Sequence, residues 1–291
     1  MQRTAGIRET VVRSVLTPTG GFIEGFTHSM NPYMGCAFGE HGCGAYCYVA
    51  ESPLGRYAGL PWGTWVEVKT NAPAVLRREL ARMPDPRDLR VFMSSATDPY
   101  QPTEGYARVT RGVLEVLHDH PIGLLLVQTR SPIVERDLDL LAVMPFAWLS
   151  MTVETDDDEV RRALTPTRPS IDRRFATLRA ARAAGVRVQV TVSPALPHHV
   201  EAFAARLAEV ADRVLVDTLC GDGAMGKRSA RRPIVARLAE RGVRDWRDEA
   251  DARILFEHLR TRLGEHRVGW SQEGFNALAI AARDQHAAAR G

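Results

Sequence analysis

The feature that most constrains the fold of this chain is the repeated alternation of short apolar runs with amphipathic stretches. The apolar runs are rich in β-branched residues, which predicts strands, and they lie at Gly21–His28, Arg90–Met93, Gly123–Val127, Ala147–Val153, Val186–Val192 and Arg213–Val216. The intervening stretches have apolar residues at helical spacing, which predicts helices, and they lie at Ala72–Met83, Ala107–His118, Ile133–Ala142, Ile171–Ala184 and His199–Ala211. Six strand–helix units predict an α/β fold whose parallel strands form a partly or fully closed barrel.

We expect the chain to consist of three segments, with the strand–helix units in the middle one. Residues 1–20 form an N-terminal segment, residues 21–220 hold the barrel, and residues 221–291 form a basic extension with a mixed helix at Ala250–Leu263. A length of 291 residues with 45% hydrophobic content suits one large α/β domain or two small ones. No apolar stretch matches a signal peptide, and none approaches the ~20 residues of a membrane span. We therefore expect a cytoplasmic protein.

Polar side chains gather directly after the predicted strands. They lie at Ser94–Asp98, Gln128–Ser131, Thr152–Thr155, Ser193–Pro194 and Asp217–Cys220. In parallel barrels the carboxyl ends of the strands carry the active site. The loop Cys36–Cys47 follows the first predicted strand, so we expect it to open on the same face.

Three of the four cysteines, Cys36, Cys43 and Cys47, lie within this one glycine-rich loop. Three thiolates can hold an iron–sulfur cluster and leave one iron without a protein ligand, where a small molecule can bind. The alternative is zinc, held by the same cysteines and His41. The usual zinc spacings come as two pairs, which this loop lacks, so the pattern favours the cluster.

The residues around these cysteines resemble the spore photoproduct lyase branch of the radical S-adenosylmethionine (SAM) superfamily. The resemblance rests on Asn31–Cys36 (NPYMGC), His41–Cys43 (HGC) and Tyr46–Tyr48 (YCY), although the C-x6-C-x3-C spacing is longer than the common C-x3-C-x2-C. Other matching segments follow in order along the chain, at Val68–Ala72, Thr97–Glu104, Thr129–Ser131, Arg136–Asp137, Leu164–Ser170, Ala184–Val186 and Ser193–Pro197.

The resemblance implies a partial (β/α)6 TIM-like barrel with parallel strands and a C-terminal helical extension. It also implies a [4Fe–4S] cluster held by Cys36, Cys43 and Cys47, with SAM bound at the open iron and cleaved to a 5′-deoxyadenosyl radical. The protein then has to position SAM and exclude stray hydrogen donors.

Further residues receive roles in SAM binding from the same resemblance. We expect Tyr46 to pack by the adenine, and Ser94 and Thr97 to meet the methionine or ribose end. We expect Arg130 to pair with the SAM carboxylate, and Glu154 to accept hydrogen bonds from ribose or amino groups. The alternative for Ser94, Thr97 or Glu154 is that the side chain caps the end of a strand.

Two residues are candidates for catalytic hydrogen transfer. The spore lyase carries its hydrogen-donor cysteine in the second-strand loop, where this chain has Ser94 and Ser95. Cys220 follows the sixth predicted strand, and its thiol is the first candidate donor; its alternative is a small buried apolar residue. Tyr100 is the second candidate.

An arginine-rich stretch follows the barrel. Its basic residues are Lys227, Arg228, Arg231, Arg232, Arg237, Arg241, Arg244 and Arg247, in a chain of net charge +3. Such a stretch is either a solvated face or a track for phosphates.

The function that we expect is a radical SAM lyase that repairs a pyrimidine photoproduct, with DNA as partner and a reductase, flavodoxin or ferredoxin as electron donor. The alternatives are a radical SAM enzyme acting on a small molecule or peptide, and a noncatalytic zinc-bearing nucleic-acid-binding protein.

Overall fold

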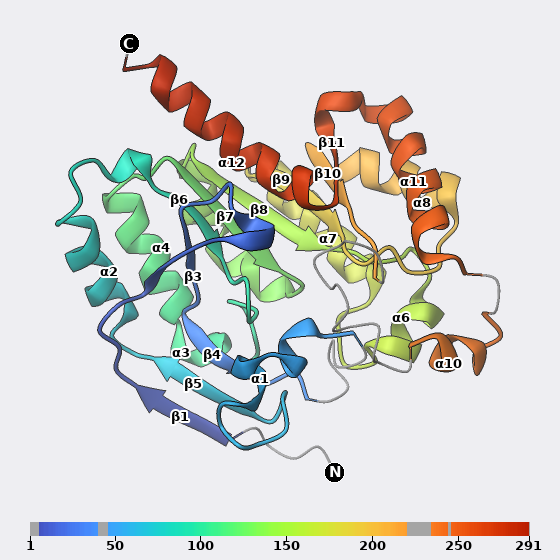
Figure 1. Ribbon diagram of the computed structural model, residues 1–291, viewed down its shortest axis with the longest axis horizontal. Coiled ribbons are helices and arrows are strands. Elements are labelled where there is room, and N and C mark those ends of the chain that lie inside the picture. The colour runs from blue at the N-terminus through green and yellow to red at the C-terminus, as the bar shows by residue number, and fades with distance from the viewer. Residues whose placement is uncertain (1–5, 40–45, 220–233, 244–245, 291) are drawn as a thin grey trace.

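The computed structural model describes residues 6–39, 46–219, 234–243 and 246–290. Its main element is an eight-stranded sheet (Figure 1). In spatial order the strands are β11 (Val268–Trp270), β10 (Arg213–Val216), β9 (Arg187–Val192), β8 (Ala147–Thr152), β7 (Leu124–Thr129), β6 (Arg90–Met93), β3 (His28–Met30) and β2 (Leu16–Pro18). All neighbours are parallel except β2 and β3. Together with its crossover helices the sheet forms a partial barrel, which confirms the predicted fold class.

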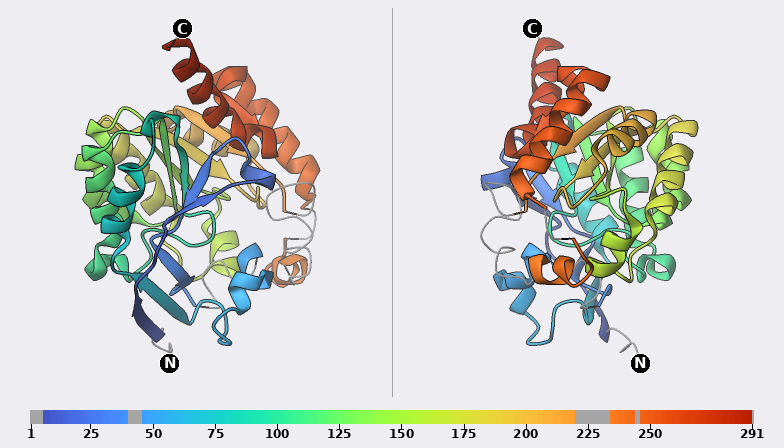
Figure 2. Two further views of the ribbon diagram at one scale, coloured as in Figure 1. Left: turned by 60° about the vertical axis from the view of Figure 1, so that its left-hand side comes forward. Right: turned by 90° about the vertical axis from the view of Figure 1, so that its right-hand side faces the viewer.

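Helices cover the outer face of this curved sheet (Figures 1 and 2). The longer ones are α2 (Ala72–Leu80), α4 (Val109–Asp119), α7 (Ile171–Ala183), α8 (Val200–Val210) and α11 (Asp248–Leu263). Short helices and 3-10 turns complete the set: α1 (Pro53–Arg56), α3 (Glu104–Ala107), α5 (Leu138–Val143), α6 (Asp158–Leu164), α10 (Ile234–Ala239), η1 (Gly21–Ile23), η2 (Tyr48–Glu51), η3 (Pro86–Asp88), η4 (Pro132–Asp137) and η5 (Glu265–Arg267). Apolar side chains of the strands and helices merge into one large core between the two layers.

The structure confirms the predicted alternation of strands and helices over most of the barrel. The predicted strands Arg90–Met93 and Arg213–Val216 have the observed bounds of β6 and β10. Gly185 ends α7 with φ +85°, and its N–H donates to the carbonyl oxygen of Arg182 at 2.9 Å. The N–H of Val186 donates to the carbonyl oxygen of Ala181 at 3.0 Å, so the helix ends in a Schellman motif with glycine at its left-handed position.

The first predicted strand, Gly21–His28, is wrong. Residues 21–23 form η1, and the strand begins only at His28. The cause is a set of tertiary contacts with the last helix, α12 (Ser271–Ala288). The Phe22 ring packs edge-on against Phe275 at 5.1 Å, and the side chain of Asn276 bonds the carbonyl oxygen of Phe22 and the N–H of Gly25.

A second, three-stranded sheet carries the first cysteine. Its order is β1 (Gly6–Thr10), β5 (Trp65–Lys69) and β4 (Tyr33–Cys36), with β1 parallel and β4 antiparallel to β5. We did not predict this sheet from the sequence. The cysteine loop therefore starts from β4 rather than directly from a barrel strand, and Cys36 is the last residue of β4.

The C-terminal part of the chain joins the barrel. β11 pairs in parallel with β10, and α12 packs its Phe275 and Ala279 against the sheet face opposite the outer helices. Figure 2 shows α12 projecting beyond the rest of the molecule at its C-terminal end. The division into segments 1–20, 21–220 and 221–291 stays a prediction. None of the helices in the described part of the chain has the length and apolarity that crossing a membrane requires.

Candidate cofactor and active site

A cavity of about 380 Å³ lies at the carboxyl ends of the barrel strands. Cys36 and Cys47 line it from the cysteine loop, and the residues that follow the strands line it from the barrel. Those residues are Ser94–Asp98 after β6, Gln128–Arg130 at the end of β7, Thr152 on β8, and Thr191 and Ser193 at the end of β9. The structure thus brings the cysteine loop and the strand-end residues to one site.

The thiol groups of this cavity suit a metal cluster. Cys36 ends β4 and Cys47 immediately precedes η2, and both side chains are buried. Cys43 lies outside the described residues. Buried sulfur ligands from two ends of one short loop, facing the same cavity, fit the three-thiolate donor set of an iron–sulfur cluster.

Hydrogen bonds hold the backbone of the cysteine loop in place. The hydroxyl of Thr97 donates to the carbonyl oxygen of Gly35 at 2.6 Å, and the N–H of Ala37 donates to the side-chain oxygen of Gln101 at 3.0 Å. The N–H of Gly39 donates to the carbonyl oxygen of Gly63 at 2.8 Å. Thr97, for which we predicted a SAM contact, therefore also fixes the strand that carries Cys36.

Glu154 is the centre of a buried ion-pair network beside the cavity. Its carboxylate accepts hydrogen bonds from the Tyr46 hydroxyl at 2.7 Å, the Arg130 Nε at 2.7 Å and the Arg174 Nη1 at 2.6 Å. Burial favours a raised pKa of Glu154, but the charges of Arg174 and Arg130 and the hydrogen bonds from Arg130 and Tyr46 hold the pKa well below its usual range. Three of the predicted SAM-binding residues thus meet, with Glu154 bound by protein donors.

Asp98 is a cavity residue to which we assigned no role from the sequence. Its carboxylate accepts from the Thr129 hydroxyl at 2.7 Å and from the backbone N–H of Arg130 at 3.0 Å. These contacts fix the end of β7, where the chain delivers Arg130. Its place in the polar segment Ser94–Asp98, which follows β6, was the signal that could have identified it.

Ser94 adopts an uncommon backbone conformation at the end of β6, with φ +73°. It lines the cavity, and its hydroxyl is buried without a hydrogen-bond partner among the described residues. Burial of a hydroxyl without a hydrogen-bond partner costs free energy, unless a bound ligand supplies that partner. The placement agrees with the predicted contact to SAM, which stays a prediction.

Tyr100 lies away from the cavity lining. Its side chain is fully buried, and burial together with the charges of Asp137 and Glu104 raises its pKa well above the usual value. Glu104 accepts from the hydroxyl of Tyr33 and, at 2.5 Å, from Arg136. The segments Thr97–Glu104 and Arg136–Asp137 that carried part of the resemblance therefore build an internal network that anchors β4.

Uncharged polar side chains of β7, β8 and β9 bond one another beside the cavity, and Gln128, Thr152 and Thr191 among them line it. The Gln128 amide donates to the Thr152 hydroxyl at 2.6 Å, and the Gln189 amide donates to the Ser150 hydroxyl at 3.2 Å. The Ser150 and Thr191 hydroxyls lie 2.8 Å apart. Gln128 and Thr152 belong to the predicted strand-end polar residues, whereas Ser150, Gln189 and Thr191 lie within predicted strands and received no role from the sequence.

The comparison with protein families agrees with this architecture. The model of the radical SAM superfamily matches residues 30–209, which include the cysteine loop and the strands from β4 to β9. The chain belongs to the radical SAM superfamily. Its members use a [4Fe–4S] cluster and SAM, which confirms the predicted cofactors and sets the zinc alternative aside.

The sequence relatives match part of the chain. An uncharacterized protein of Mycobacterium tuberculosis is 34% identical over 180 residues, which are 59% of this chain and 50% of the relative. An uncharacterized protein of Methanocaldococcus jannaschii is 27% identical over 175 residues, 60% of this chain and 62% of the relative. The chain thus matches about half the length of the mycobacterial relative.

Solved structures of spore photoproduct lyase share the fold. A double mutant with bound AdoMet and dinucleoside spore photoproduct has a TM-score of 0.59 and 16% identity, covering 91% of this chain and 81% of that chain. The lyase complexed with dinucleoside spore photoproduct gives the same TM-score, identity and coverage. At this level of identity the likeness establishes the fold.

Proposed function

We propose that this radical SAM protein is a lyase that acts on a pyrimidine photoproduct in DNA. The observation that carries the proposal is the cavity at the strand ends, which combines buried Cys36 and Cys47 with Arg130, Ser94 and Asp98. Its support is the fold shared with spore photoproduct lyase, whose structures hold AdoMet and the dinucleoside lesion.

In this proposal Cys36, Cys43 and Cys47 hold the cluster, and the cluster when bound supplies the electron that cleaves SAM to a 5′-deoxyadenosyl radical. Arg130 binds the SAM carboxylate, and its bond to Glu154 orients the guanidinium before SAM arrives. Glu154 also bonds the hydroxyl of Tyr46, so it acts through Arg130 and Tyr46 rather than by direct contact with ribose. Ser94 completes the hydrogen bonding at the SAM end of the site.

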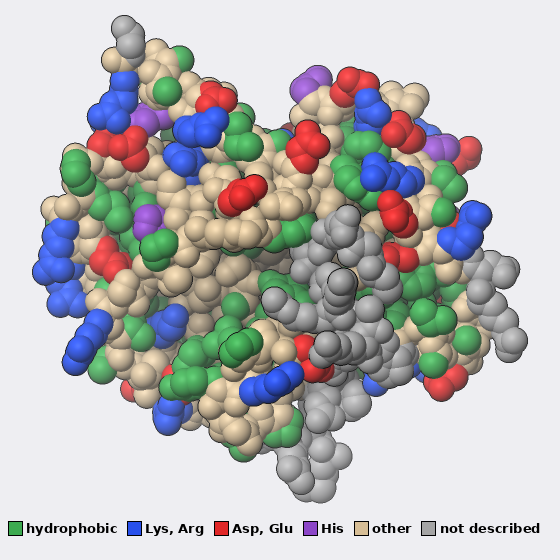
Figure 3. Space-filling view, viewed as in Figure 1, with side chains coloured by type: hydrophobic (Ala, Val, Ile, Leu, Met, Phe, Trp, Pro, Cys, Tyr) green, Lys and Arg blue, Asp and Glu red, His purple; other side chains and the backbone are tan. Residues whose placement is uncertain are grey.

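The proposed partners are DNA and an electron donor of the reductase, flavodoxin or ferredoxin kind. Of the basic stretch, Arg237, Arg241 and Arg247 lie within the described residues, while Lys227, Arg228, Arg231, Arg232 and Arg244 lie outside them. On the face shown in Figure 3, the described cationic and anionic side chains are interspersed. The support for DNA is thus the shared fold rather than a basic surface.

Turnover of a defined lesion tests this proposal. The full chain, reconstituted anaerobically with iron and sulfide, is incubated with SAM, dithionite and either dinucleoside spore photoproduct or DNA that carries the lesion. Mass spectrometry then follows 5′-deoxyadenosine and restored thymine. We expect loss of the lesion with both substrates. SAM cleavage that leaves the lesion intact in both would contradict the repair function and favour a small-molecule or peptide substrate.

A further inference from the structure

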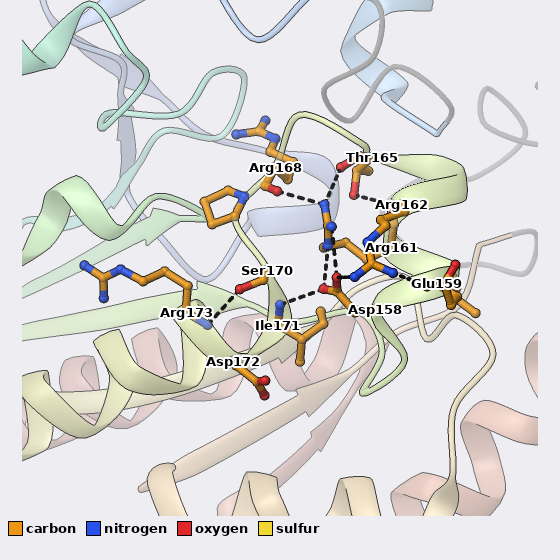
Figure 4. Close-up of polar contacts among 12 residues, drawn as sticks. Asp158, Glu159, Arg161, Arg162, Thr165, Arg168, Ser170, Ile171, Asp172 and Arg173 are labelled. Carbon is orange, nitrogen blue, oxygen red and sulfur yellow. Dashed lines mark hydrogen bonds and ion pairs between the residues drawn. The ribbon is translucent and has the colours of Figure 1, made fainter.

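The loop between α6 and α7 is held by an arginine–aspartate pair. Arg161 donates from Nε and Nη2 to the two carboxylate oxygens of Asp158, at 2.7 and 3.0 Å. Its Nη1 donates to the carbonyl oxygen of Arg168 at 2.8 Å, and Asp158 also accepts from the N–H of Ile171 at 3.1 Å. Figure 4 shows this pair at the centre of the loop, with the Arg168 side chain directed away from it.

Arg168 extends from this loop to the cofactor cavity. Its side chain is only 2% exposed, and it lines the same cavity as Cys36 and Cys47. The guanidinium carbon lies 3.3 Å from the centroid of the Phe38 ring, two residues after Cys36. Beside this stack, the Thr167 hydroxyl donates to the carbonyl oxygen of Phe38 at 3.2 Å. Two side chains of the α6–α7 loop thus contact Phe38 of the cysteine loop, one at its ring and the other at its backbone.

The guanidinium of Arg168 faces the carboxylate of Asp98 at the cavity wall. Its Nη1 lies 3.7 Å from the Asp98 Oδ2, an ion-pair distance longer than a hydrogen bond. The same Asp98 oxygen accepts the backbone N–H of Arg130 at 3.0 Å, and its other oxygen accepts from Thr129. Because its side chain is 2% exposed and lines the cavity, Arg168 places a permanently charged guanidinium at the cavity wall, in a region of low effective dielectric.

We propose that Arg168 is a positioning residue of the cofactor site: it fixes the cysteine loop by stacking on Phe38, and its buried charge favours the reduced state of the cluster. The inference rests on the family's cofactors and not on the lyase activity. A thiolate-bound cluster becomes one charge unit more negative on reduction. A nearby buried cation stabilises that state, because charges interact more strongly away from water.

A redox titration of the SAM-free holoprotein tests this proposal. The electron paramagnetic resonance signal of the reduced cluster measures the fraction reduced at each potential. Arg168→Gln should lower the equilibrium constant for one-electron reduction about tenfold, which equals about 59 mV. Arg168→Lys keeps the charge and should stay within about threefold of the wild type. The matched control is Arg206→Gln, which removes a second arginine–phenylalanine stack, over Phe175 at 4.1 Å on the outer layer; it should leave the potential unchanged.

The possible results separate cleanly. Arg168→Gln with a full iron content and the wild-type potential would overturn the proposal. If Arg168→Gln holds no iron, Arg168→Lys decides: the proposal requires it to retain the cluster at nearly the wild-type potential. Loss of iron from the lysine variant as well would overturn the role of the charge. Lesion turnover enters none of these readouts, so failure of the proposed lyase activity leaves this test intact.

Discussion

Single residues in this protein have more partners than their place in the sequence indicates. Glu154 shows this, because its carboxylate joins Tyr46 of the cysteine loop, Arg130 after β7 and Arg174 of α7. The sequence placed Tyr46, Arg130 and Glu154 near the cofactors through their motifs and strand ends. It did not predict that they bond one another or that Arg174 joins them, because those contacts depend on the packing of elements far apart in the chain.

Replacement of Glu154 by glutamine should destabilise the protein strongly. The variant leaves Arg174, whose side chain is fully buried, without its counter-charge, and breaking a buried pair in this way costs about 3–5 kcal/mol. Urea unfolding measures the change. Glu209→Gln, in a solvent-exposed pair with Arg179 at 3.8 Å, is the control and should change the free energy of unfolding by about 1 kcal/mol at most.

The same pair makes a prediction about pH. Because the folded-state pKa of Glu154 lies below the usual value of 4.5, its ionised carboxylate stabilises the fold above that pH, and this contribution is lost as the pH falls below it. The difference in unfolding free energy between wild type and Glu154→Gln should therefore shrink on going from about pH 6 to about pH 3. A difference that stays constant or grows would contradict the assignment.

Cys220 lies outside the described residues, and its proposed role rests on its place after β10. A thiol gives up a hydrogen atom to a carbon radical easily, whereas a serine hydroxyl does not. Cys220→Ala should therefore still form 5′-deoxyadenosine but accumulate abortive substrate products, as seen by mass spectrometry. The alternative of a buried structural cysteine predicts an unaltered product pattern and a loss of about 1 kcal/mol in stability.

At the level of elements, the barrel strands β6 to β10 and the outer helices followed from periodicity, whereas β2, β3, β11 and the second sheet did not. Val66 and Val68 of β5 are apolar and β-branched, but the strand is short and flanked by Gly63 and Asn71. β4 contains Gly35, which weakens any strand prediction. Its φ of +83° and its contact with Trp65 explain why glycine occupies this position.

Gly35→Ala should disrupt the pairing of β4 with β5. A Cβ at this position would lie 2.4 Å from the carbonyl oxygen of Trp65, so overpacking of about 1–3 kcal/mol adds to the strain of a positive φ. Gly185→Ala is the matched control, since its φ is +85° and its added Cβ meets nothing within 4 Å. Unfolding experiments should give a larger loss for Gly35→Ala; equal losses would show that the Trp65 contact is unimportant.

For the molecule as a whole, the sequence predicted a cofactor-binding partial barrel. It did not predict that the N-terminal and C-terminal parts of the chain contact each other. Phe22 near the N-terminus and Phe275 of α12 pack together at one wall of the cavity. No local pattern encodes a contact between segments so far apart. The cysteine loop was predictable because its chemistry is local, while the supporting network of Tyr33, Glu104 and Arg136 emerges only from the fold.

The iron content of the four single cysteine-to-alanine variants tests the central claim most directly. Each variant is reconstituted anaerobically and its iron and sulfide are measured per chain. We predict that Cys36→Ala, Cys43→Ala and Cys47→Ala each lose most of their iron, because three thiolates hold the cluster and one iron stays open for SAM. Cys220→Ala should retain the wild-type content. Equal loss of iron from Cys220→Ala would mean that four cysteines ligate the cluster, which closes the open iron and contradicts the account.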